Sequence, residues 1–528
     1  MSIRSKLQHV SESPTRPTPG QASRRFDVAE LYQGLIADPD ARPSAGGSLH
    51  EKLQQAYWWI VNRGIISPFY DIEYNDTPPQ RFSFGDAKVQ LTLPTDQSYS
   101  SYVLLPLLSL ATRRRCLLVG GPGRGKTAIA VLMGVLAGYN LNELKRAIQH
   151  GQPQMTIADL LGNPLPSTLV NAKSMDEVQI AWRRWLGMRV KIIDEYNRIP
   201  TRTQSALLTV MADNYAELYD QIFECPPGAW YLTANDDAGG GTYQVIEALR
   251  DRIDVVVKAL HFNSRYLDEL LLRVEEGFKP EEVVPPEIIF TPEELDQMER
   301  EIRQVKLPDP LRRRLEFFTS HFELWEGGAR QLEYMTKDTV KLSGLELRSF
   351  ASASAGKDAA VDLGAQTRNG VSVRALMTTL IFVKGMAYFR GEKEVSFEDI
   401  RQMLPFVLHD KLVQEPDAPF FELSDNPALR SDRVSWLREL WDLSCKQFES
   451  FNLDQDDPVG KLGEEYERGL EGLKEEELRR RLAVIEATLR ELAKGRKLYG
   501  HLYDDLLRLK AMHQHYTNVL SWTLQCAQ

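Results

Sequence analysis

Residues 116–138 read CLLVGGPGRGKTAIAVLMGVLAG, and this stretch decides the fold. It begins with four apolar residues that are typical of a buried strand, and it ends in an apolar helical pattern. Between these patterns, glycines and a Lys-Thr pair stand in the spacing GxxxxGK(S/T), in the strand-to-helix context that a phosphate-binding loop requires. A plain strand-to-helix connection needs neither so many glycines nor the Lys-Thr pair. The residues assigned to this loop are Gly120, Gly121, Pro122, Gly123, Arg124, Gly125, Lys126, Thr127 and Ala128.

The chemistry of this loop follows from its residue types. Glycines let the backbone curl so that successive N–H groups face one anion, with the positive end of the following helix behind them. Lys126 is then expected to reach the β- and γ-phosphates of a nucleotide, and Thr127 to offer its hydroxyl to Mg²⁺. The loop therefore predicts that the chain binds ATP and Mg²⁺.

A second motif, VKIIDEYNRIP at residues 190–200, is an apolar strand pattern that ends in Asp194 and Glu195. A carboxylate pair at a strand end is a weak signal alone, but after the loop it is typical of the segment that holds Mg²⁺ in phosphoryl-transfer enzymes. We expect Asp194 to hold Mg²⁺ through water. Glu195 could polarise the water that attacks the γ-phosphate.

A third apolar strand pattern, WYLTAN at residues 230–235, ends in the polar residue Asn235. The carboxyl ends of parallel strands line the ligand crevice of such sheets, so Asn235 could orient the attacking water or contact the γ-phosphate. Taken alone, an Asn at this position could equally begin a turn.

These segments together resemble one family. IIDEYNRIPTRTQSALLTVM, YLTAND and GGGTYQVIEALRDRID are similar, in order and in spacing, to the MoxR branch of the AAA+ ATPases. The resemblance implies that Asn235 is the sensor 1 residue. It also implies that Arg252 is an arginine finger that reaches the γ-phosphate of a neighbouring subunit, with Arg250 as a nearby substitute. The alternative for both arginines is a surface ion pair of less than about 1 kcal/mol.

The segment that begins NGVSVRALMTTLIF at Asn369 resembles the lid domain of the same family. The resemblance implies that Arg374 is the sensor 2 arginine and contributes to nucleotide binding. Family members commonly have Pro where this sequence has Val373 and Phe where it has Ile253, and both departures are mild. The region before the loop is unusually long for this family, and the lid contains extra residues around 326–370. The residues after 413 have no counterpart that we can align.

The chain as a whole is expected to be an α/β protein, because short strand patterns alternate with helical patterns between residues 101 and 260. We expect five parts: a flexible tail (1–48), an N-terminal extension packed on the core through its aromatic residues (49–100), the AAA+ P-loop core with a parallel sheet (101–260), a helical lid (261–412) and a C-terminal helical extension (413–528). Two leucine-rich stripes in the last part predict a coiled-coil hairpin of two antiparallel helices. The stripes are Leu478, Leu482, Ile485, Leu489 and Leu492, followed by Leu502, Leu506, Leu509, Tyr516 and Leu520.

Composition limits the other function classes. The 528 residues carry a formal net charge of −10, which argues against binding of nucleic acid through a general positive field. The 4 cysteines form no CxxC pair, so neither a zinc ribbon nor a disulfide framework is predicted. No apolar run reaches the length of a membrane helix, and we expect a cytoplasmic protein without membrane insertion.

Our first functional hypothesis is a remodelling ATPase. The family resemblance implies a homo-oligomeric ring, expected to be a hexamer, that acts on a client protein with a von Willebrand factor A-domain partner. The alternative is an AAA+ nucleic-acid motor or loader, which the acidic charge and the lack of a basic-aromatic stretch disfavour. A scaffold that binds ATP without turnover is disfavoured because Glu195 and Arg252 are both present.

Overall fold

The computed structural model describes residues 47–75, 77–85, 89–171, 177–235, 247–345, 347, 362–423, 426–470, 472–495 and 498–526. The tail predicted for residues 1–48 lies outside these residues except for its last two. The GGGTYQVI stretch (239–246) and, in the 326–370 addition, residues 346 and 348–361 also lie outside them.

A five-stranded parallel sheet forms the centre of the molecule, as the strand patterns predict. Its order is β13-β5-β12-β9-β6. The strands are β5 (Arg115–Val119), β6 (Gln149–His150), β9 (Val190–Asp194), β12 (Ala229–Ala234) and β13 (Val255–Lys258). All six residues of β12 are buried, as expected for a central strand of a sheet that helices cover. Only β6, which has two residues, was missed by the sequence, because so short a run has no periodicity.

Helices from the core and from the N-terminal extension cover this sheet. α3 (Ser101–Thr112) packs on β5, β12 and β13, and α4 (Lys126–Leu136) packs on β9 and β12. α2 (Leu49–Trp59) packs on α3. Its Tyr57 is buried and accepts a hydrogen bond at its hydroxyl from the backbone N–H of Ser100 at 2.8 Å. The other core helices are α5 (Leu141–Ala147), α6 (Ile157–Leu161), α8 (Thr201–Asp213) and α9 (Glu247–Arg252).

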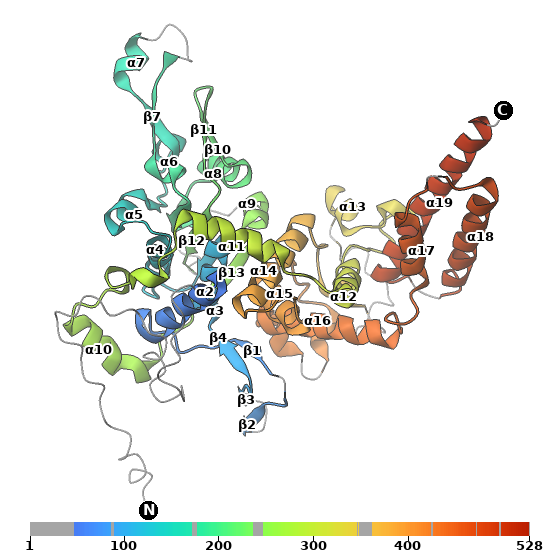
Figure 1. Ribbon diagram of the computed structural model, residues 1–528, viewed down its shortest axis with the longest axis horizontal. Coiled ribbons are helices and arrows are strands. Elements are labelled where there is room, and N and C mark those ends of the chain that lie inside the picture. The colour runs from blue at the N-terminus through green and yellow to red at the C-terminus, as the bar shows by residue number, and fades with distance from the viewer. Residues whose placement is uncertain are drawn as a thin grey trace, which may run out of the picture.

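Two slender projections leave the core on the same side (Figure 1). One is an arm made of β7 (Gly162–Pro164), α7 (Pro166–Asn171) and β8 (Ile180–Trp182). The other is the hairpin of β10 (Tyr215–Leu218) and β11 (Gln221–Glu224). Trp182 of the arm and Phe223 of the hairpin pack against each other, with ring centroids 5.5 Å apart.

The N-terminal extension differs from expectation in one respect. Its sheet of β1 (Ile72–Tyr74) and β4 (Gln97–Tyr99) is buried at Tyr74 and Tyr99, but the hairpin of β2 (Gln80–Phe84) and β3 (Val89–Leu93) projects from the body. Phe82 and Phe84, two of the aromatic residues on which that expectation rested, are 45% and 54% exposed. Both side chains lie on one face of a two-stranded ribbon that none of the described helices covers.

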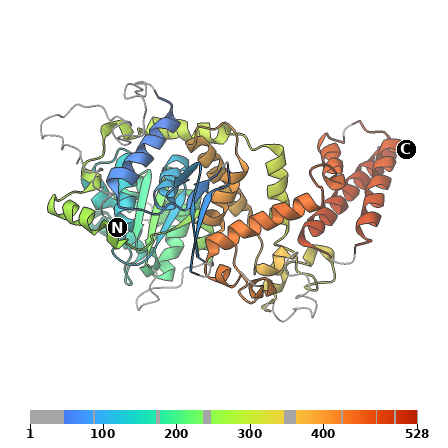
Figure 2. The same ribbon diagram turned by 90° about the horizontal axis from the view of Figure 1, so that it is seen from below.

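Most of the helical region follows the core along the long axis (Figure 2), but its first helix, α10 (Leu267–Glu275), lies on the opposite side of the core (Figure 1). The other helices of this region are α11 (Pro292–Gln304), α12 (Asp309–Ser320), α13 (Lys337–Leu342), α14 (Val373–Phe389) and α15 (Phe397–Leu408). α14 packs on α3 and on α15, so the lid and the sheet share one apolar core. α15 begins with a reciprocal capping box formed by Ser396 and Asp399.

The last part of the chain divides in two. α16 (Arg433–Ser450) buries Trp436, Leu437 and Trp441 in the main core. Beyond it, α17 (Pro458–Glu467), α18 (Glu475–Leu492) and α19 (Gly500–Cys526) surround a separate small core at the far end of the molecule (Figure 2). The predicted antiparallel hairpin is α18 and α19, and α17 is a third helix that packs on both.

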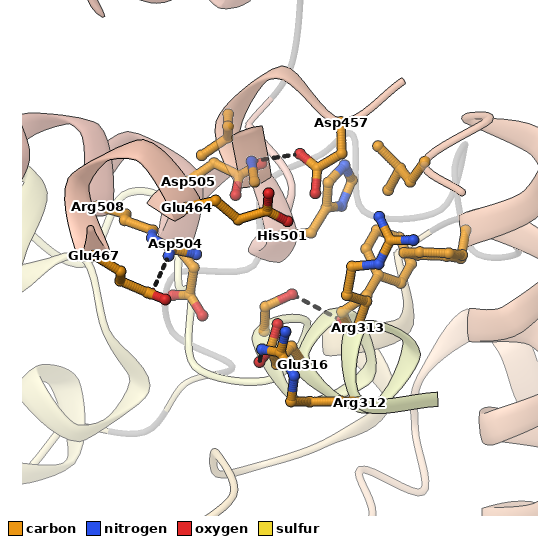
Figure 3. A pocket seen from close by; sticks show the side chains of 16 residues that line it. Arg312, Arg313, Glu316, Asp457, Glu464, Glu467, His501, Asp504, Asp505 and Arg508 are labelled. Atoms are coloured by element: carbon orange, nitrogen blue, oxygen red, sulfur yellow. Dashed lines mark hydrogen bonds and ion pairs between the residues drawn. The ribbon is translucent and has the colours of Figure 1, made fainter. Parts of the chain in front are cut away.

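A pocket of about 260 Å³ lies where this small core meets α12 and α16 (Figure 3). Asp457, Asp504 and Asp505 line it together with Arg508, which pairs with Glu467 at 3.0 Å. Burial of the Asp505 carboxyl, and then the nearby charges of Asp457 and Asp504, raise its pKa to about 7.

None of the described helices is long and apolar enough to cross a membrane.

The raised pKa predicts the sign of a pH effect on stability. A carboxyl whose pKa is higher in the folded state than in the unfolded chain stabilises the fold at low pH, and this contribution disappears as pH rises through the folded pKa. We expect the unfolding temperature of the α17–α19 module to fall between pH 5.5 and 7.5, and to fall less in Asp505→Asn. Differential scanning calorimetry measures both changes. Glu465→Gln, an exposed carboxyl on α17, is the control; an equal pH effect in Asp505→Asn and wild type would contradict the assignment.

Candidate active site

The phosphate-binding loop runs from Gly120 to Gly125 between β5 and α4, where the parallel strands end. Gly123 and Gly125 both have φ of +74°, a left-handed conformation that favours glycine. A Cβ on Gly120 would lie 2.7 Å from the carbonyl oxygen of Ala259. The loop therefore needs glycine at these positions, for conformation at two of them and for close backbone approach at the third. Its exposed members are Pro122, Gly123 and Gly125, and Ala128 is exposed in the first turn of α4.

Lys126 lies inside the curve of this loop. Its Nζ donates hydrogen bonds to the carbonyl oxygens of Gly120 at 2.6 Å and Gly121 at 2.8 Å, and to Asn235 Oδ1 at 2.9 Å. The residue is only 7% exposed. A strongly hydrated ammonium is held there by oxygen atoms of the loop and of the neighbouring strand, so the structure brings Lys126 and Asn235 together.

Arg124 points away from this ammonium. Its Nη1 donates to the carbonyl oxygen of Ala259 at 2.9 Å, and its own carbonyl oxygen accepts from the Tyr102 hydroxyl at 3.0 Å. Arg124 thus ties the loop to the end of β13 and to α3. In the described chain its contribution is to fix the loop.

Asp194 ends β9 and connects the loop to two strands. Its Oδ1 accepts hydrogen bonds from Thr127 Oγ1 at 2.8 Å and from Thr233 Oγ1 at 2.7 Å. Its Oδ2 lies 3.2 Å from Nδ1 of His150, at the end of β6. Thr127 and Asp194 are hard oxygen donors that touch each other, which is a donor set that fits Mg²⁺ and its waters.

Glu195 has a strained backbone. Its φ of +52° is uncommon for a residue with a side chain, and such outliers gather at functional sites. Its N–H donates to Thr233 Oγ1 at 2.9 Å. Its Oε1 accepts from Asn235 Nδ2 at 2.8 Å, and its Oε2 pairs with Arg198 Nε at 3.3 Å. The carboxylate is therefore oriented from both sides.

The predicted arginines lie at the opposite edge of the sheet. β13 pairs with β5 so that Val255 lies opposite Cys116, and the N–H of Asp254 donates to the carbonyl oxygen of Arg115. α9, which carries Arg250 and Arg252, therefore ends at the amino edge, whereas the loop begins at the carboxyl edge. The length of β5 separates them by about 13 Å, since a strand rises about 3.3 Å per residue.

Arg374 belongs with α9 and not with the loop of its own chain. Its Nη1 pairs with Asp251 Oδ2 at 2.6 Å. Arg252 is its neighbour, since α14 packs on α9. Burial, and then the nearby charge of Arg374, lower the pKa of Arg252. Arg252 Nη1 donates to the carbonyl oxygen of Ala248 at 3.3 Å, and its Nε is buried without a hydrogen-bond partner in the described chain. The structure thus brings the two arginines together and keeps them away from Lys126, Asp194 and Glu195.

Sequence reasoning missed four residues that support this arrangement. Arg198 and Thr233 stand inside the quoted motifs. Arg198 is three positions after Glu195 and Thr233 is two positions before Asn235, so periodicity could have found both. Asp251 also stands inside a quoted motif, between Arg250 and Arg252, whereas His150 lies on the two-residue strand β6 and carries no local signal. Within the described residues, no cluster of three or more His, Cys, Asp or Glu side chains could hold a metal ion by itself.

The geometry predicts an effect of a glycine outside the motifs. A Cβ on Gly151 would lie 2.2 Å from the carbonyl oxygen of Glu195, which is backbone and cannot move freely. We expect Gly151→Ala to displace Glu195 and to lower the rate of ATP hydrolysis, the activity that the sequence predicts, by more than about tenfold. Gly187→Ala is the matched control, because its Cβ would lie 3.8 Å from the Phe223 ring. A coupled ATPase assay measures the rate, and circular dichroism establishes that both variants are folded. Normal turnover in Gly151→Ala would contradict the strained geometry.

Comparisons with known proteins agree with this arrangement. The family model described as "ATPase family associated with various cellular activities (AAA)" matches residues 115–255, and the model "AAA lid domain" matches residues 360–428. Chaperone MoxR1 of Mycobacterium tuberculosis is 24% identical over 334 residues, which are 62% of this chain and 74% of the relative. Uncharacterized protein YeaC of Bacillus subtilis is 23% identical over 319 residues, 60% of this chain and 83% of that protein.

A solved structure from Cytophaga hutchinsonii, of a protein assigned as an ATPase, is 20% identical with a TM-score of 0.43. The match covers 63% of this chain and 89% of that one. The parallel sheet, the core and lid models and the curated relatives agree on the class. These findings support a MoxR-like AAA+ ATPase that hydrolyses ATP, with an AAA ATPase domain followed by an AAA lid domain.

Proposed function

We propose that the chain hydrolyses ATP at sites shared between the subunits of a homo-oligomeric ring, and that the resulting motion remodels a client protein complex. One observation carries this proposal: the phosphate loop and the arginine pair lie at opposite edges of one parallel sheet. A single copy cannot bring both to one nucleotide. Head-to-tail association can, because such an interface joins two different surfaces and closes into a ring.

At the carboxyl edge we assign the nucleotide to the loop. The backbone of residues Gly120 to Gly125 would surround the phosphates, with Lys126 against the β- and γ-phosphates. Thr127 and Asp194 would hold Mg²⁺, which supplies charge neutralisation at the phosphate oxygens. Their mutual contact at 2.8 Å supports this assignment.

Glu195 is assigned as the general base. A positioned base contributes typically 10²–10⁴-fold to a reaction, provided that its oxygen is within hydrogen-bond reach of the proton. The Glu195 carboxylate is held between Asn235 and Arg198, so its free lone pairs have a set direction. Glu195 would accept a proton from the attacking water, and Asn235 would orient that water and the γ-phosphate.

Arg252 and Arg374 are assigned to the neighbouring subunit. An arginine near the transferring phosphoryl group stabilises the charge that develops there and can contribute roughly 10³–10⁵ in rate. The pair lies on α9 and at the start of α14, and α14 belongs to the lid. Hydrolysis in one subunit would therefore act on the lid of the next.

The object of this motion is inferred from the relatives. One curated relative is named as a chaperone, which supports a client protein as the substrate of remodelling. We propose a hexameric ring and a von Willebrand factor A-domain partner on the family resemblance. A nucleic-acid motor is the alternative, and the net charge of −10 counts against it. DNA-stimulated, salt-sensitive ATP hydrolysis would favour that alternative.

Glu195→Gln tests the assignment of the base. The amide keeps the volume and the contact with Asn235 but cannot accept the proton, so we expect ATP binding to persist and hydrolysis to fall by at least about 10²-fold. Nucleotide binding by fluorescence and phosphate release measure the two effects. Glu217→Gln, an exposed carboxyl on β10, controls for the change of charge. Unchanged hydrolysis in Glu195→Gln would exclude this residue as the base.

Mixed rings test the supply of arginine by the neighbour. Arg252→Ala and Lys126→Ala are each expected to be inactive alone. In an equal mixture, intact loops of one variant meet intact arginines of the other, and activity should return to at most roughly a quarter of the wild-type value. Analytical ultracentrifugation establishes that the variants assemble. If assembled mixtures stay inactive, Arg252 does not act across the interface.

A further inference from the structure

Two aspartates fasten the lid helix α14 to the core at the arginine edge. Asp251 lies on α9. Its Oδ1 accepts from Ser372 Oγ at 3.0 Å, and its Oδ2 pairs with Arg374 Nη1 at 2.6 Å. Ser372 is the N-cap of α14, and its Oγ also accepts from the N–H of Ala375. Asp251 therefore contacts both the N-cap of the lid helix and its first arginine.

Asp254, three residues later, is the buried member of the same connection. It is fully buried, and its Oδ1 accepts from Thr378 Oγ1 at 2.7 Å. Its Oδ2 accepts from the backbone N–H of Arg115 at 2.9 Å and pairs with the Arg115 side chain at 3.3 Å. All its oxygens are thus satisfied, as a buried carboxylate requires, and β5 is joined directly to α14.

One face of α14 makes these contacts. Arg374 and Thr378 are four residues apart, so they lie on the same side of the helix. Arg252 lies between the two aspartates in sequence and beside Arg374 in space. Two guanidinium groups repel each other, and the carboxylate of Asp251 is the opposite charge that keeps Arg374 at this place.

We propose that Asp251 is a positioning residue, which holds Arg374 beside Arg252 so that both guanidinium groups reach the neighbouring subunit's nucleotide as one unit. This inference rests on the proposed supply of arginine across the ring. The inference adds that Asp251 couples the lid of each subunit to the nucleotide of the neighbouring subunit. The nucleotide bound by the same subunit acts on that lid only through the core. Asp254 anchors the unit to the sheet.

The two aspartates differ in what their loss does to the fold. The Asp251–Arg374 pair is partly exposed, with 33% of the aspartate and 45% of the arginine side chain accessible, so it contributes little to stability. Removal of Asp254 would leave buried partners without an acceptor and would destabilise the chain. Asp251 is therefore the residue whose replacement tests positioning without unfolding.

The test uses Asp251→Ala in the full chain, with Asp251→Asn as the variant of equal volume should the alanine variant fail to assemble. We expect kcat for ATP to fall by roughly ten- to a hundredfold, because misplaced groups at a reacting centre cost rates of this order. Binding of a fluorescent ADP analogue should stay within about twofold, since the chain's own loop is untouched and ADP lacks the γ-phosphate. A purely structural defect would lower both.

Glu247→Ala is the matched control. Glu247 lies on the same helix and pairs with Lys341 of α13 at 2.7 Å, so its removal also breaks an ion pair between core and lid. It holds no arginine of the proposed unit, and its kcat should match wild type. Equal losses in Glu247→Ala and Asp251→Ala would overturn a specific role of Asp251.

Mixing with Lys126→Ala separates this inference from the proposed function. Asp251→Ala should regain activity in the mixture, because Lys126→Ala subunits supply correctly held arginines to intact loops. Suppose that mixing rescues Arg252→Ala, so that the shared site is supported. Positioning by Asp251 is then wrong in either of two cases: Asp251→Ala alone has a normal kcat, or Asp251→Ala is inactive and mixing does not rescue it. If Arg252→Ala itself is not rescued, the proposed function fails first.

Discussion

Parallel pairing holds β5 between β12 and β13, and the direction of this strand determines where every group of the site lies. All five strands end at the same edge, so the phosphate loop, Asp194, Glu195 and Asn235 meet without long connections. The same direction places Asp254, with α9 just before it, at the other edge. A phosphate-binding surface and a guanidinium surface therefore lie on opposite sides of one body. Such surfaces cannot meet within one copy, which is the condition that favours head-to-tail association.

Hydroxyl groups connect the loop, the strands and the carboxylates into one network. Thr233 donates to Asp194 and accepts from the N–H of Glu195, so it fixes the side chain of one residue and the backbone of the next. A positive φ at a residue with a side chain costs on the order of 1–3 kcal/mol, and it persists only where surrounding contacts determine it. The contacts of Thr233 and Asn235 do so for Glu195. Groups that are held in this way do not have to reorganise during a reaction.

Much of the fold and half of the site could be predicted from local patterns. The strands that carry the motifs, the helix from Val373 to Phe389 and the C-terminal hairpin all have strong periodicity, and the structure contains each of them. The exceptions have physical reasons. β6 is too short for a pattern, and the aromatic residues Phe82 and Phe84 are apolar without being buried, because composition does not say whether a ribbon finds a covering helix. α17 has a mixed composition and becomes a core element only through its contacts with α18 and α19.

The sequence by itself determined the phosphate loop, the Asp194–Glu195 pair and the alternation of strands and helices, because each depends on residues that are neighbours along the chain. Only the tertiary structure decided that Arg374 lies with Arg252 and apart from the loop of its own chain, and that Asp251 holds it there. The residues of that ion pair are 123 positions apart. Their contact arises from the packing of α14 against α9, and no periodicity or spacing within either segment specifies it.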